Sequence, residues 1–169
     1  MQWISPAEAL YLRDVMLPVL ETARRTTRQV FELIPAPLLD YRPAPAYKTA
    51  RQLSAYIIGT ELFFLEGIVL GGFPASGMVP FDLNAPADET SAADQPADFS
   101  AQITFYEIAH KDMLQRLQKL DGEQLARPLP FRRLMTLPAV QYLTLTQFHT
   151  AHYLRELLAR GRVTSARTA

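Results

Sequence analysis

The chain has no cysteine, and it has only three histidines among its 169 residues. Without a thiol it has no cysteine nucleophile, no thiolate zinc site and no ligand for an iron–sulfur cluster. Imidazole chemistry is therefore confined to His110, His149 and His152. The sequence also contains no glycine-rich phosphate loop, no nucleophile elbow and no HExxH motif.

An excess of charge of one sign is missing as well. The 17 basic side chains are balanced by 17 acidic ones, which gives a formal net charge of zero. Binding to a phosphate backbone depends on a basic surface that releases counterions. The composition therefore predicts no nucleic-acid partner.

Long uninterrupted hydrophobic runs are absent too. The densest apolar stretch, residues 57–70, is interrupted by Glu61 and Glu66, and the first residues do not resemble an export signal. We expect a soluble, cytoplasmic protein with no membrane partner, and the lack of cysteine is consistent with a reducing compartment. With 49% apolar residues, the chain is expected to form one domain, residues 1–169.

Four amphipathic helices are predicted from apolar residues at turn spacing. The first starts after Ser5 and reaches about residue 34, with a kink or break at Pro18. The second is capped by Thr49 and ends near residue 70, and the third covers about residues 99–120. The fourth covers about residues 139–160, with Pro138 in its entrance and Gly161 as its stop.

The connections are expected to be irregular. Residues 35–45 contain four prolines and read as an extended crossing segment, and residues 127–131 also read as extended. Residues 72–98 are predicted to form a long surface loop, and residues 162–169 a frayed tail. Four helices that each need a partner favour an all-α fold, a four-helix bundle with long connecting loops.

The apolar spacing also assigns the faces of two helices. On the second and third helices the predicted core residues are Leu53, Tyr56, Ile57, Thr60, Phe63, Phe64 and Ile68, then Ile103, Tyr106, Met113, Leu117 and Leu120. His110, beside Lys111 and Asp112, is expected to face solvent.

The richest polar constellation lies in the fourth helix. His149, His152, Tyr153 and Glu156 lie three or four residues apart and form a polar stripe. Two imidazoles and a carboxylate on neighbouring turns are suited to zinc, nickel, iron or manganese. The same side chains would also satisfy one another by hydrogen bonding at the end of the bundle.

A second candidate surface lies on the second helix. Tyr56 has Thr60 one helical turn after it, and Glu61 directly follows Thr60. A phenol in that place either orients a ligand or packs with its hydroxyl at the rim of the core.

The order of these landmarks resembles the DinB/YfiT-like superfamily of small bacterial four-helix proteins. The resemblance is carried by LLDYRPAP at 38–45, SAYIIGTE at 54–61, LARPLPF at 125–131 and the last helix with His149. It covers nearly the whole chain. It implies a bundle of that type, and in relatives a divalent-metal site of three histidines that serves thiol transferases or hydrolases.

The family's three ligand positions fall on Tyr56, His149 and Tyr153, because YLREL at 153–157 stands where relatives have HRGQL. Only His149 keeps an imidazole. His152 lies one residue before the third position, a rotation of about 100° around the helix. The resemblance therefore implies a degraded site, with His149 and His152 as the remaining metal candidates and Glu61 and Glu156 as pocket residues.

Three hypotheses for the function follow. The first is a small-ligand or protein-binding module that binds no metal tightly. The second is a transferase or hydrolase in which His149, His152 and a carboxylate hold zinc, nickel or manganese. The third is a structural partner, a homodimer formed through the apolar sides of the first two helices.

Overall fold

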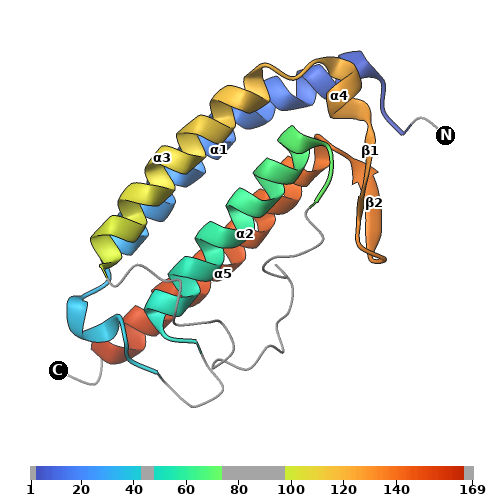
Figure 1. Ribbon diagram of the computed structural model, residues 1–169. Helices are drawn as coiled ribbons and strands as arrows, with labels where there is room; N and C mark the ends of the chain where they lie inside the picture. The colour runs from blue at the N-terminus through green and yellow to red at the C-terminus, as the bar shows by residue number, and fades with distance from the viewer. Residues whose placement is uncertain (1–2, 43–47, 74–97, 166–169) are drawn as a thin grey trace.

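The computed structural model describes residues 3–42, 48–73 and 98–165, with side chains described up to residue 159. Four long helices form the bundle: α1 (Pro6–Glu32), α2 (Ala50–Leu70), α3 (Phe99–Gln118) and α5 (Gln141–Ser165). In Figure 1, α1 lies beside α3, and α2 lies beside α5. Since α2 also packs on α3 and α1 on α5, the four helices surround a shared interior, in which the buried apolar side chains form two clusters. The predicted all-α four-helix bundle is confirmed.

Shorter elements close the two ends of the bundle. A 3-10 turn, η1 (Ala36–Leu38), follows α1, and a five-residue helix, α4 (Gly122–Ala126), follows α3 and packs on α1. The strands β1 (Pro128–Phe131) and β2 (Met135–Pro138) then form an antiparallel hairpin that leads into α5. The chain segment that connects α3 to α5 therefore consists largely of ordered elements (Figure 1).

Local sequence explains why the helices begin where they do. Ser5 and Glu8 form a reciprocal capping box at the start of α1, and Thr49 and Gln52 form another at the start of α2. Asp98 caps α3 by accepting a hydrogen bond from the Ser100 amide at 2.9 Å. These caps satisfy amide groups that have no partner within the first turn.

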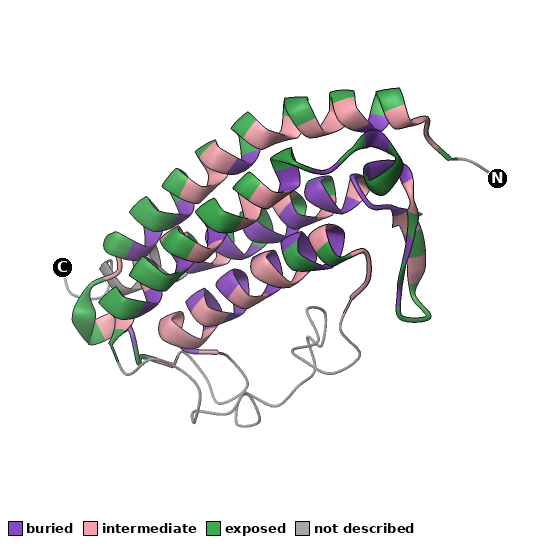
Figure 2. Ribbon diagram, turned by 45° about the horizontal axis from the view of Figure 1, so that its top comes forward, coloured by how far each residue is buried: buried purple, intermediate pink, exposed green. Residues whose placement is uncertain are grey.

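Burial follows the predicted helix faces. Figure 2 shows buried residues on the inward faces of the helices and exposed residues on the outward faces. On α2 and α3 the buried apolar side chains include Leu53, Tyr56, Ile57, Phe64, Ile68, Tyr106 and Leu117. Phe63, Ile103 and Met113, also predicted to be core, are only partly buried and pack against the core from its edge.

Helix α2 is the one helix in the described residues whose length and composition would allow it to cross a membrane. Within the bundle, 67% of its most apolar window is buried against the other helices. A core helix of a folded domain has that property. Its high apolar content is accounted for by packing.

Two boundaries of the long helices differ from the sequence prediction. Helix α1 runs as one element through Pro18, so of the predicted kink or break the break does not occur. Proline removes one backbone hydrogen bond, but packing on α3 and α5 along the helix compensates for it. Helix α5 continues past Gly161 to Ser165, so the predicted stop and the start of the frayed tail at residue 162 are wrong. A glycine inside a helix costs only about 1 kcal/mol.

The predicted connections also need correction. The third helix was expected to reach about residue 120; α3 ends at Gln118, and Asp121 caps the short helix α4, which the sequence did not predict. Pro138 was expected in the entrance of the last helix; it ends β2 and pairs with Pro128. Residues 127–131 are extended, as predicted, whereas residues 36–38 of the proline-rich segment form a 3-10 turn. Most of the predicted loop at 72–98, residues 74–97, lies outside the described residues.

Candidate functional site

Three aromatic side chains meet between α2 and α5. The ring centroid of Tyr56 lies 5.3 Å from that of His149 and 5.1 Å from that of Tyr153, and the last two are 4.6 Å apart. Tyr56 and His149 are each 4% exposed, and Tyr153 is 8% exposed. The structure thus brings the three residues at the family's ligand positions together as one packed cluster, called here the aromatic cluster.

Burial dominates the electrostatics of this cluster. Loss of hydration raises the pKa of Tyr153, while a hydrogen bond with the Tyr56 hydroxyl acts in the opposite direction. The ammonium group of Lys48 lies 5.7 Å from the Tyr56 ring centroid. Tyr153 is therefore a neutral phenol at physiological pH, and its hydroxyl is engaged with a neighbouring phenol.

Two other predicted site residues, His152 and Glu156, lie at the border of this cluster beside Tyr153. His152 is exposed and touches only the edge of Tyr153, with ring centroids 4.9 Å apart. Glu156 is half-buried one turn further along α5. His152 precedes Tyr153 by one residue, a rotation of about 100° around the helix, and its side chain is exposed whereas that of His149 is only 4% exposed.

Glu61 belongs to a second group, in the interior of the bundle. Its Oε1 lies 2.7 Å from Nε2 of His110, and the Tyr106 hydroxyl lies 3.1 Å from both carboxylate oxygens. The Thr150 hydroxyl donates to Oε2 at 3.1 Å. Glu61, Tyr106 and His110 have no exposed surface, and Thr150 has 1%. We call these four residues the buried polar network.

The network satisfies a charge that would otherwise be costly to bury. A carboxylate in the interior needs hydrogen-bond donors or a counter-charge, and Glu61 has donors from α3 and α5. Burial and the negative charge of Glu61 together raise the pKa of Tyr106 far above its ordinary value. Tyr106 thus remains a hydrogen-bond donor throughout the physiological pH range.

The expectation that His110 faces solvent is wrong. Its position follows Tyr106 by four residues and precedes Met113 by three and Leu117 by seven, so it belongs to the same helix face as those predicted core residues. Its polarity suggested solvent, but the phase of the helix determines its burial. That phase was the signal from which the network could have been found.

Metal-ligating residues do not gather in the described part of the chain. Among residues 3–42, 48–73 and 98–159, no group of three or more His, Asp or Glu side chains is arranged to hold a metal ion. Glu61, the carboxylate nearest in sequence to Tyr56, already accepts hydrogen bonds from Tyr106 and Thr150 and lies 2.7 Å from Nε2 of His110.

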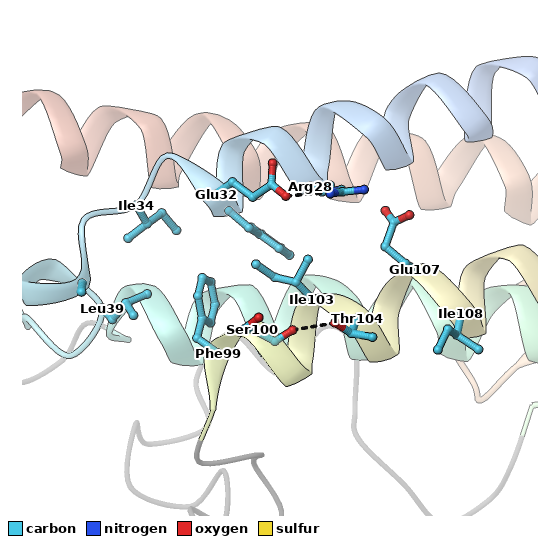
Figure 3. A pocket seen from close by; sticks show the side chains of 12 residues that line it. Arg28, Glu32, Ile34, Leu39, Phe99, Ser100, Ile103, Thr104, Glu107 and Ile108 are labelled. Atoms are coloured by element: carbon cyan, nitrogen blue, oxygen red, sulfur yellow. Dashed lines mark hydrogen bonds and ion pairs between the residues drawn. The ribbon is translucent and has the colours of Figure 1, made fainter.

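Two hollows open on the described surface. One, of about 530 Å³, lies between α1 and α3; Figure 3 shows Phe99, Ile103 and Ile34 along it, with the charged side chains towards one end. There Arg28 donates to Glu32 at 2.8 Å, and Glu107 pairs with Arg24 of α1. The other, of about 430 Å³, lies between α1 and α5.

The arrangement of α1, α2, α3 and α5 defines the chain as a four-helix bundle. The sequence profile of the DinB superfamily matches residues 19–157. The chain belongs to the DinB superfamily.

Solved structures of low sequence identity have the same fold. A DinB-like protein of Bacillus subtilis, YjoA, is 21% identical, with 89% of this chain and 91% of that chain covered and a TM-score of 0.66. YfiT of Bacillus subtilis is 18% identical, with 90% and 87% covered and a TM-score of 0.72. YfiT is described as a probable metal-dependent hydrolase with an unusual four-helix bundle topology. No curated protein sequence matches this chain.

Proposed function

We propose that this chain is a binding module of the DinB superfamily that works without the three-histidine metal site of its relatives. The observation that carries the proposal is the aromatic cluster. Two of its three positions hold phenols, and the three rings pack against one another at centroid distances of 4.6 to 5.3 Å. These residues do not fit a divalent metal of the zinc or nickel type.

The donor chemistry supports this conclusion. A neutral imidazole binds borderline divalent metals directly, whereas a phenol with a pKa of about 10 must first lose its proton. Burial makes that loss harder for Tyr153 by raising its pKa further. Only His149 then remains as a ready ligand in the cluster, and one ligand does not hold a catalytic metal that usually needs three.

The second candidate function is a divalent-metal-dependent thiol transferase or hydrolase that uses His149 and His152. The description of YfiT as a probable metal-dependent hydrolase favours it. In that function Glu61 or Glu156 would complete the ligand set. The interactions of Glu61 with His110, Tyr106 and Thr150, and the exposure of His152, weigh against it.

Calorimetric titration of the purified chain with zinc, nickel and manganese tests the two functions against each other. The binding module is expected to show no stoichiometric binding at micromolar affinity. Binding of micromolar strength or tighter that is abolished by both His149→Ala and His152→Ala would overturn the proposal and support the metal enzyme. The matched control is Tyr56→Phe, which removes a hydroxyl and leaves both imidazoles in place.

A homodimer is proposed as the assembly. Tyr11 and Val15 of α1 are exposed apolar residues on a helix whose outer side is otherwise largely polar, and Tyr11 is 69% exposed. Light scattering gives the mass in solution. A monomer at all accessible concentrations would contradict this assembly without affecting the proposal about metal binding.

A further inference from the structure

The groove between α1 and α5 has the dimensions of a small-molecule site. Its volume is about 430 Å³, which is within the range of about 300 to 1,000 Å³ typical of ligand pockets. Pro18, Val19 and Ala23 of α1 form one apolar wall, and Ala151 and Leu154 of α5 form the other. The aromatic cluster does not contribute to it, so the groove is a separate site.

The groove is electrically neutral. Of the nine described residues that line it none carries a charge, although 20% of the residues in the chain are charged. The hollow between α1 and α3 differs, since Arg28, Glu32 and Glu107 line it. An ion entering the neutral groove would lose hydration and gain no counter-charge, so the lining favours an uncharged ligand.

The polar groups of the groove are mostly committed as donors. The Thr22 hydroxyl donates to the carbonyl of Pro18 at 2.9 Å, and the Thr26 hydroxyl donates to the carbonyl of Thr22 at 3.1 Å. The Thr150 hydroxyl donates to Glu61. Because each hydroxyl has a single hydrogen, these oxygens have only lone pairs left to offer a ligand.

Gln147 supplies the complementary group. It lines the same groove, and its Nε2 is buried with no hydrogen-bond partner among the described residues. A buried amide nitrogen without a partner is costly, and a ligand acceptor would satisfy it. The groove thus combines one unused donor with hydroxyl acceptors on apolar walls.

Thr150 connects this groove to the buried polar network. The Thr150 hydroxyl donates a hydrogen bond to the Glu61 carboxylate, which also interacts with His110 and Tyr106. Donation to a charged acceptor polarises the hydroxyl and makes its oxygen a better acceptor for a second hydrogen bond. Thr150 is therefore the strongest acceptor position on the floor of the groove.

We propose that the α1–α5 groove binds a small uncharged molecule with an apolar body and one group that both donates and accepts hydrogen bonds, such as a primary amide. The amide N–H donates to the Thr150 oxygen, and the amide carbonyl accepts from Gln147. The apolar body packs on Val19, Ala23 and Leu154. This inference deepens the proposed binding function by naming a ligand class.

Three probes of the same skeleton test the charge preference. Hexanamide, hexanoate and hexylammonium are titrated into the isotopically labelled full chain, and amide chemical shifts are followed by NMR. Hexanamide is expected to shift α1 and α5 resonances saturably, and both ions are expected to bind at least about tenfold more weakly. Equal affinities for the three probes, or no saturable shift with hexanamide, would overturn the proposal.

Substitutions then locate the site. Ala151→Leu fills the groove and is expected to weaken hexanamide binding at least about tenfold, because it occupies the space of the apolar body. Ala101→Leu, the same change at an exposed position of α3, is the matched control and is expected to have no effect. Equal effects of the two variants would contradict the location.

A second copy of the chain is the competing occupant. If sedimentation shows a dimer that Ala151→Leu dissociates, and hexanamide does not bind the wild type, the groove is a dimer interface and the ligand proposal is wrong. The experiments contain no added metal. A negative result with hexanamide therefore does not bear on the proposal about the aromatic cluster, which the metal titration tests separately.

Discussion

Nε2 of His110 lies 2.7 Å from Oε1 of Glu61 in the interior of the bundle, and neither side chain has any exposed surface. The contact joins the middle of α3 to the middle of α2, and Thr150 extends it to α5. One buried carboxylate therefore contacts side chains of two other long helices, α3 and α5. Substitution of only one of the two residues is therefore expected to destabilise the fold strongly.

His110→Leu is expected to destabilise the chain by about 3–5 kcal/mol, because it leaves the Glu61 carboxylate buried without its closest partner. Urea denaturation measures the loss. The double variant His110→Leu/Glu61→Leu replaces both partners by apolar groups and should recover most of the stability. A double variant no more stable than the single one would show that the pair acts through packing alone.

The sequence predicted the elements that depend on local signals. Thr49 marks the start of α2 and Gly71 its end, since Gly71 adopts φ 80° at the C-cap. Pro138 was misplaced because proline suits both the first turn of a helix and the edge of a two-stranded hairpin. The hairpin depends on long-range packing: Leu129 and Phe131 are buried, and Tyr142 donates to the Leu129 carbonyl at 2.8 Å.

Only part of the candidate site could be predicted from the sequence. The resemblance placed Tyr56, His149 and Tyr153 at related positions, and the structure packs them together. The buried polar network was missed because His110 was assigned to solvent from its polarity, while Glu61 was predicted as a pocket residue rather than a core residue. Partners 49 residues apart on different helices become neighbours only once the helices are packed, so a single sequence does not predict their contact.

Alkaline pH is expected to destabilise the fold. Burial raises the pKa values of Tyr106, Tyr142 and Tyr153 in the folded state, so above pH about 10 the unfolded chain loses phenolic protons that the folded chain retains. The contribution of these tyrosines to the free energy of unfolding is constant below pH about 10. It falls as the pH rises from there through their folded-state pKa values. Denaturation midpoints between pH 8 and 11, set beside those of Tyr142→Phe, measure the effect. A midpoint independent of pH over that range would contradict it.

Phe64→Ala is expected to cost about 3–5 kcal/mol. The ring is fully buried, and it packs against Tyr142 and Phe131 with centroid distances of 5.9 and 5.6 Å. Thermal and urea denaturation give the change. Leu70→Ala, at a position 61% exposed on the same helix, is the control and should change stability by less than about 0.5 kcal/mol.

Gly71→Ala is expected to destabilise the end of α2, while Gly72→Ala is expected to be nearly neutral. Gly71 has φ 80°, a conformation that costs an L-residue roughly 1–2 kcal/mol, and an added Cβ would lie 2.3 Å from the Arg127 guanidinium. That guanidinium donates to the Ile68 carbonyl at 2.9 Å. A Cβ at Gly72 meets no atom within 4 Å. Equal denaturation midpoints for the two variants would refute the argument.

Replacing both phenols of the aromatic cluster by histidine is expected to create a metal site. The three rings already pack within 4.6 to 5.3 Å of one another, so Tyr56→His/Tyr153→His would place three imidazoles around one point. Calorimetry should show one zinc or nickel ion bound per chain, with an affinity at least about a hundredfold above that of the wild type. The triple variant that adds His149→Ala should lose it, because two imidazoles leave the site one ligand short. A double variant that folds normally and binds no metal would show that the three side chains do not converge on a common centre.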